Sequence, residues 1–190
     1  MKTPEPPADL PFRDQIQPAP NVEQHLLKDN GVIPNNPRLP LLIYRGALRV
    51  GGDDPAAVCE AVFARWNWRG SWRNGIYPFH HYHSTSHEVL GVYAGHANVR
   101  LGGEGGGGIE AVLAAGDVVV IPAGTGHCNL GASGDFGVVG AYPDGRTWDL
   151  LRGRPGERPQ ADQNIAGLPL PTNDPLYGPE GPLRQVWRAE

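Results

Sequence analysis

GIYPFHHYHSTSHE, residues 75–88, contains four of the chain's seven histidines between positions 80 and 87. The tyrosine, serines and glutamate among the histidines exclude a purification tag. Three interpretations stay open for this density of imidazoles: a metal site, a polar surface, or a hydrogen-bonded cluster in the core.

The alternation of side chains along an extended strand separates these histidines into two groups. His81 and His83 project from one face, while His80 and Tyr82 point to the other. Two imidazoles on one face make half of a metal site. His80 is therefore expected to face away from the ion.

Glu88 follows His83 by an odd number of positions, which would place it on the wrong face of a regular strand. The polar stretch 84–87 is suited to a turn or bulge that resets the alternation. With that reset, Glu88, Leu90 and Val92 face inward, and a carboxylate oxygen lies beside two imidazoles.

A fourth ligand is expected from a distant strand. Residues 116–127, GDVVVIPAGTGH, predict an apolar strand, a Pro/Gly turn, and a histidine that starts the next strand. We therefore predict a site for one divalent transition-metal ion made of His81, His83, Glu88 and His127. The competing interpretation is a satisfied polar core without an ion, and no ligand is missing that would favour it.

The other candidates near this cluster are expected to be structural. His87 could replace Glu88 as a ligand if the turn were built differently, but a surface or supporting role is favoured. His25 and His96 stand alone in ordinary strand sequence. Cys128 points opposite to His127 by alternation and is expected to be packed rather than catalytic.

Two motifs in this region resemble those of the cupin superfamily. The first consists of Gly75, His81, His83, Glu88 and Gly95, and the second of Gly116, Pro122, Gly124 and His127. The family often carries an asparagine four residues after the last histidine, where this chain has Gly131. Because that position does not bind metal, the departure leaves the predicted site intact. The segment 34–40, which is rich in proline, and the segments 142–145 and 148–153 resemble the small bacterial single-domain cupins of the YjlB type.

The resemblance implies an all-β double-stranded β-helix, a jelly-roll barrel, with one or two short helices packed outside. Three nitrogens and one oxygen suit Fe, Mn, Ni, Zn, Co or Cu, and the sequence does not distinguish among these ions. We expect an enzyme that uses the ion on a small oxygenated molecule, and the resemblance implies oxygenases, decarboxylases and isomerases as candidates. A cupin that only binds or senses a small molecule or sugar is the alternative. A metal-free sugar-nucleotide isomerase is disfavoured because the ligand set is complete. The resemblance further implies a homodimer.

Length and charge exclude several other classes. A chain of 190 residues fits one domain, and its net charge of −4 is spread without blocks, so neither nucleic acid nor a membrane is an expected partner. The first residues lack the apolar core of a secretory signal, and we expect a cytoplasmic protein. Cys59 and Cys128 are too few for a disulfide framework and are expected to be reduced.

Proline and apolar runs divide the chain. Sixteen of the twenty prolines lie in residues 1–40 or 151–190, so extended or looped ends are expected. We predict a proline-rich arm at 1–20 that need not be ordered, a barrel at 21–150, and a proline-rich arm at 151–190 that wraps it. Six strands are predicted, within residues 39–48, 87–95, 97–103, 109–113, 117–124 and 136–143. A helix is predicted at about 54–67, on the outside of the barrel.

Aromatic and charged residues near the motifs leave more than one role open. Most of the aromatic residues are expected to fill the core: Trp72, Tyr77, Phe79, Tyr93, Tyr142 and Trp148. Arg100, Arg146 and Asp149 are more typical of a solvated surface than of a substrate contact. The glycine run 102–108 predicts a flexible hairpin loop, because no Lys-Ser/Thr pair follows it.

Overall fold

A computed structural model describes residues 12–18, 21–105 and 107–188 of the chain. Most of the predicted arm at 1–20 lies outside these residues. The elements, in order, are a 3-10 turn Arg13–Gln15, β1 Asn21–His25, β2 Leu41–Arg45, α1 Pro55–Arg65, β3 Trp68–Asn74, β4 Glu88–Ala94, β5 His96–Leu101, β6 Ile109–Ala114, β7 Val118–Ile121, β8 His127–Ala132, β9 Gly137–Pro143, α2 Gln160–Gly167 and α3 Pro182–Val186.

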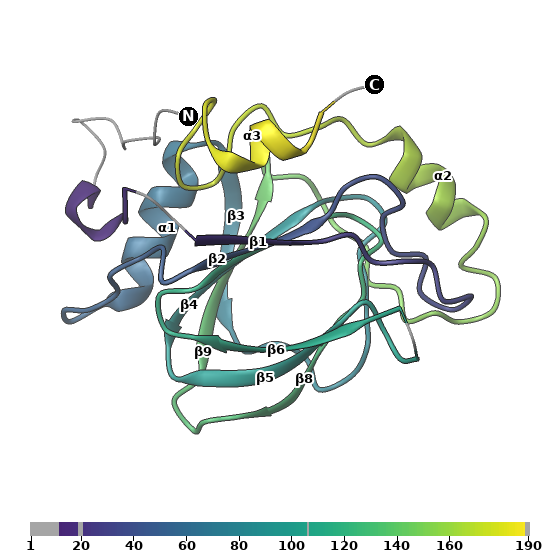
Figure 1. Cartoon of the computed structure of the whole chain (residues 1–190), viewed down its shortest axis with the longest axis horizontal. Coiled ribbons are helices and arrows are strands. Elements are labelled where there is room, and N and C mark those ends of the chain that lie inside the picture. The colour runs from purple at the N-terminus through teal and green to yellow at the C-terminus, as the bar shows by residue number, and fades with distance from the viewer. Residues whose placement is uncertain (1–11, 19–20, 106, 189–190) are drawn as a thin grey trace.

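Two antiparallel sheets face one another (Figure 1). The larger sheet has the strand order β1-β2-β7-β4-β9-β3, and the smaller one has the order β6-β5-β8. Non-consecutive strands are neighbours in both sheets, as expected for a jelly roll. All six predicted strands are present, and the fold is the predicted cupin jelly roll.

Both faces of the larger sheet are buried, which explains its nearly continuous apolar strands. In β7, Val118 and Val120 pack toward α1 and the C-terminal segment, whereas Val119 and Ile121 pack between the two sheets. Strand β4 alternates in the same way, with Val89 on the outer side and Leu90 between the sheets. This alternation places Glu88 on the same side as Leu90.

Helix α1 confirms the prediction of a helix at about 54–67. Pro55 occupies its first turn, where a missing N–H costs nothing, and Val62 and Phe63 are buried against the larger sheet. The C-terminal region differs from the expected extended arm because it contains α2 and α3, which brings the α-helices in the described residues to three. Proline does not prevent them, since Pro159 is the N-cap residue before α2 and Pro182 is the first residue of α3.

The C-terminal segment is fastened to the outer face of the larger sheet by a buried carboxylate. Asp174 accepts hydrogen bonds from the Tyr44 hydroxyl at 2.6 Å and from the backbone N–H groups of Leu176, Tyr177 and Leu183 at 2.8–3.0 Å. Nearby, the Trp187 indole donates to the carbonyl of Pro40 at 2.9 Å. In the described part of the chain, no helix combines the length and apolar character that crossing a membrane requires.

Candidate metal centre

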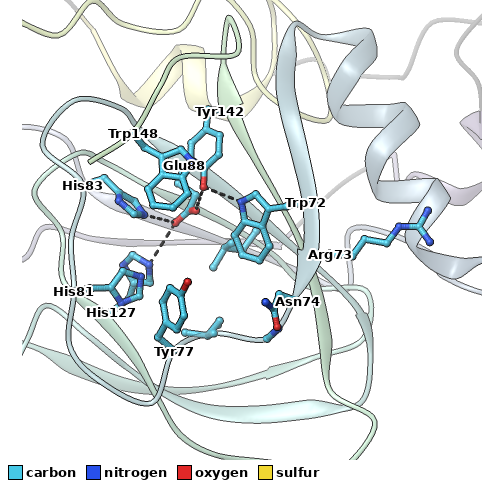
Figure 2. A pocket seen from close by; sticks show the side chains of 13 residues that line it. Trp72, Arg73, Asn74, Tyr77, His81, His83, Glu88, His127, Tyr142 and Trp148 are labelled. Atoms are coloured by element: carbon cyan, nitrogen blue, oxygen red, sulfur yellow. Dashed lines mark hydrogen bonds and ion pairs between the residues drawn. The ribbon is translucent and has the colours of Figure 1, made fainter. Parts of the chain in front are cut away.

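The four predicted ligands converge at one end of the space between the sheets (Figure 2). One ligand atom from each of His81, His83 and His127 lies within 4.8 Å of the others. Glu88 Oε2 lies 3.3 Å from His127 Nε2 and 3.5 Å from His83 Nε2. Each of the four residues is at most 5% exposed.

Backbone pairing places the histidines. His81 and His127 form an antiparallel bridge, with N–H···O distances of 3.3 and 3.0 Å, and their ring centroids are 4.0 Å apart. Tyr82 forms the same kind of bridge with Leu151 on the other side. Residues 81–83 are therefore held extended between two other segments, which sends His81 and His83 toward one side and Tyr82 toward the other. His80 turns away, as predicted, and its Nε2 lies 2.9 Å from Glu104 Oε1.

The turn before His127 depends on Gly124 and on His87. Gly124 has a φ of +92°, and a Cβ there would lie 2.7 Å from the carbonyl oxygen of Asn35. The N–H of Ala123 in this turn donates to His87 Nδ1 at 2.9 Å. His87 is 2% exposed, so the surface role that was considered for it is wrong, and it supports the turn instead. Burial lowers the pKa of His87 to about 4, which keeps this acceptor neutral.

The hydrogen bonds of the three imidazoles determine which nitrogens face the centre. In each ring Nδ1 contacts a backbone carbonyl: that of Phe79 at 3.2 Å for His81, that of Thr125 at 3.2 Å for His127, and that of Asp149 for His83. Because a carbonyl oxygen can only accept, Nδ1 carries the proton in all three rings. The Nε2 lone pairs are left for the centre, and this tautomer is typical of histidines that bind metal through Nε2.

Glu88 completes the set with one oxygen. Its Oε1 accepts a hydrogen bond from the Tyr142 hydroxyl at 2.9 Å, and the Trp72 indole N–H donates to that hydroxyl oxygen at 2.7 Å. Its Oε2 lies at ion-pair distance from two histidines but forms no hydrogen bond of acceptable geometry with the described residues. The Trp72–Tyr142–Glu88 chain therefore orients the carboxylate so that Oε2 faces the Nε2 atoms.

The charges and acceptor atoms of the four side chains suit a bound cation. Burial acts to lower the pKa of His83, but the negative charge of Glu88 raises it above its ordinary value, so the carboxylate favours a positive charge at this point. Burial and the neighbouring His127 lower the pKa of His81 to about 3, so its Nε2 stays an acceptor. Burial acts to raise the pKa of Glu88, but His83 and His127 hold it well below its ordinary value. A divalent ion would pair with all four acceptors at once.

The pocket beside these residues is lined by more aromatic side chains than expected. Trp72, Tyr77, Tyr142 and Trp148 all face it, so the prediction that most of these aromatics fill the core is wrong for them. The sequence patterns missed this because buried and exposed residues do not alternate regularly along β3, which contains Trp72. Tyr77 and Trp148 lie outside the strands. Tyr93 packs at the edge of the outer core as expected.

Asp149 contributes through both its backbone and its side chain. Its carboxylate accepts hydrogen bonds from the backbone N–H and hydroxyl of Ser84, at 2.6 and 2.5 Å, and from the N–H and hydroxyl of Thr85, both at 3.2 Å. These bonds fix the carbonyl that accepts from His83. Arg100 has no part in the site, because it pairs with Glu110 and donates to carbonyls of the glycine loop.

Two facing antiparallel sheets with three histidines and one glutamate gathered between them define a cupin. The chain is 42% identical over 165 residues to the uncharacterized protein YjlB of Bacillus subtilis (strain 168), an alignment that spans 87% of this chain and 96% of YjlB. The chain belongs to the YjlB family of cupins. No protein-family profile matches it.

Solved structures with weaker similarity include a dioxygenase, a decarboxylase and a vicilin. An acireductone dioxygenase from Bacillus anthracis, with a cadmium ion in its active centre, is 20% identical with a TM-score of 0.36, over 51% of this chain and 67% of that one. A Bacillus subtilis oxalate decarboxylase is 19% identical with a TM-score of 0.37, over 68% of this chain and 30% of that one. A tomato vicilin is 25% identical with a TM-score of 0.33, over 44% of this chain and 22% of that one.

Proposed function

We propose that the protein holds one divalent transition-metal ion through His81, His83, Glu88 and His127, and that it is an enzyme acting on a small oxygenated molecule. The observation that supports this most strongly is the shared tautomer of the three imidazoles. Each has its Nδ1–H engaged by a carbonyl, which leaves three Nε2 lone pairs around a carboxylate oxygen that lacks a hydrogen bond.

The open side of the cluster supports chemistry rather than a purely structural ion. Four protein ligands leave coordination positions free in a six-coordinate ion, and a pocket of about 180 Å³ adjoins them. When bound, such an ion polarises a carbonyl or enediol, or binds dioxygen. The chain's own contribution is to orient Glu88 through Tyr142 and to surround the reacting molecule with apolar walls.

The test is elemental analysis of the purified protein and of His83→Ala, with His25→Ala as the control. His25 lies on edge strand β1, with its ring 3.4 Å from Glu23. We expect about one ion per wild-type chain and per His25→Ala chain, with a clear loss in His83→Ala together with a lower melting temperature in the presence of metal. Equal metal content in His83→Ala and wild type would remove His83 from the site.

The alternative is a protein that binds or senses a small molecule without converting it. Such a protein would have the same metal site but would not convert the molecule that it binds. Dioxygen uptake by iron- or manganese-loaded protein, followed with candidate diols and keto acids, separates an oxygenase from a binding protein. We expect dioxygen uptake with at least one of these compounds. No uptake with any of them would count against an oxygenase.

A further inference from the structure

The pocket beside the metal centre has flat walls on two sides. On one side the Trp148 and Tyr142 rings stack at 27° with centroids 5.8 Å apart, and Trp148 also lies 5.0 Å from the His83 ring. On another side Tyr77 stacks on Phe79 at 4.8 Å and meets the edge of His81 at 5.2 Å. Figure 2 shows the Trp72 indole closing the space between these two sides.

The size of the pocket favours a single ring. Its volume is about 180 Å³, whereas an apolar cavity of about 150 Å³ is sufficient to bind benzene. A six-membered ring with two or three small substituents therefore fits. Ile76 and Leu90 add apolar side chains to the lining, and Asn74 adds an amide.

Charge in the pocket restricts the ligand further. A divalent ion with Glu88 and three neutral imidazoles carries a net charge of +1. Arg73 is the cationic side chain of the lining, but it points away from the pocket, and its guanidinium is paired with Asp54 at 2.8 Å and Glu60 at 2.7 Å (Figure 2). Arg152 stacks on Phe79 at 3.9 Å but is not among the residues that line the pocket.

Few polar groups of the wall are left for a ligand. In the described part of the chain, the Tyr77 hydroxyl, the Trp148 indole N–H and the Asn74 side-chain N–H₂ have no hydrogen-bond partner, and all three residues are exposed at the mouth. A sugar ring, with a hydroxyl on nearly every carbon, would lose water from more groups than this wall can pair. A flat ring would stack on the aromatic walls.

We propose that this pocket binds a single flat ring bearing two adjacent oxygen atoms with one negative charge in total, as in a catechol or an enolised cyclic diketone. This inference rests on the proposed metal site and specifies its substrate class. The two oxygens would face the ion and the ring would lie between the Trp148 and Tyr77 sides. A dicarboxylate fits less well, because it carries one negative charge more than the net charge of +1 neutralises and no other free cationic side chain lines the pocket in the described residues.

The test uses 4-nitrocatechol, a coloured catechol that ionises near neutral pH, with metal-loaded protein. Binding is followed by the change in visible absorbance and by quenching of tryptophan fluorescence, and metal content is measured again afterwards by ultrafiltration. Oxalate and cis-cyclohexane-1,2-diol are the competitors: the first has two acidic groups, and the second has adjacent oxygens without a flat ring. The variant is Trp148→Ala, and Val112→Ala, at an exposed position of β6, is the control.

We expect metal-dependent binding of 4-nitrocatechol that Trp148→Ala weakens by about 3- to 10-fold and Val112→Ala leaves unchanged. Both competitors should bind at least about tenfold more weakly than the probe. Three results would each overturn the substrate class: oxalate that binds as tightly as 4-nitrocatechol, a Trp148→Ala variant with the affinity of wild type, or a probe that removes the ion. In each case the protein has first taken up metal, so the proposed metal site would stand. A wild-type protein that takes up no metal would instead refute the metal site and this inference together.

Discussion

The Tyr142 hydroxyl offers the sharpest test of how the metal centre is built. It donates to Glu88 Oε1 at 2.9 Å in a site where Tyr142 and Glu88 are both 2% exposed. A buried hydrogen bond to a charged group contributes about 1.5–3 kcal/mol. At about 1.4 kcal/mol per tenfold, its loss in Tyr142→Phe corresponds to a reduction in metal affinity of about 10- to 100-fold if the bond serves to orient the ligand.

Tyr177→Phe is the matched control for this change. The Tyr177 hydroxyl is also largely buried, but it donates to the carbonyl of Gln17 at 2.6 Å on the outer side of the larger sheet. Competition with a fluorescent chelator measures the metal affinity, and urea unfolding of the metal-free proteins measures stability. Both variants should lose about 1 kcal/mol or more of stability, and only Tyr142→Phe should lose metal affinity. A metal affinity of Tyr142→Phe within about twofold of wild type, with Glu88→Gln clearly impaired, would refute the orienting role.

Three further predictions concern residues around the site and the core. Asp174→Asn should lower the free energy of unfolding by about 3 kcal/mol, because an amide N–H₂ would face the donors of Tyr44 and Leu183, while metal content stays that of wild type; urea unfolding with elemental analysis checks both. Glu157→Gln should lower stability at pH 7 by about 1 kcal/mol, because Glu157 accepts from Tyr82 and from backbone N–H groups; burial acts to raise the pKa of this carboxyl, but those bonds hold it below its ordinary value of 4.5. The wild-type advantage is therefore complete above pH 4.5 and shrinks as the pH falls through the lowered pKa, so an equal difference at pH 7 and about pH 3 would contradict the assignment. Gly140→Ala should displace the Trp72 ring, because a Cβ at position 140 would lie 2.2 Å from it. We expect a change in tryptophan fluorescence and weaker metal binding. An unchanged fluorescence spectrum would show that the Trp72 ring is not confined.

Sequence reasoning predicted the candidate ligands because their positions depend on local geometry. Alternation places His81 and His83 on one face, and a polar turn resets that alternation before Glu88. A short stretch of Val, Pro and Gly likewise predicts the strand and the turn that lead to His127. These features need only neighbouring residues, and the structure brings the four side chains together as predicted.

The groups that orient those ligands could not be predicted in the same way. The carbonyl of Asp149 accepts from His83 across 66 positions of sequence, and Tyr142 reaches Glu88 across 54. Nothing in the residues near 149 marks one backbone carbonyl as a partner for a histidine. Such contacts exist only after strands distant in sequence have paired.

The sequence by itself determined the class of fold and the four candidate ligands, since ligand type and spacing are local properties that survive any arrangement of the rest. Tertiary structure alone decided the tautomer of the imidazoles, the single free oxygen of Glu88 and the aromatic walls of the pocket. The physical reason is that hydrogen-bond partners and the lining of a cavity are set by which surfaces meet, and Trp72, Tyr77 and Trp148 meet only when the sheets have closed over the site.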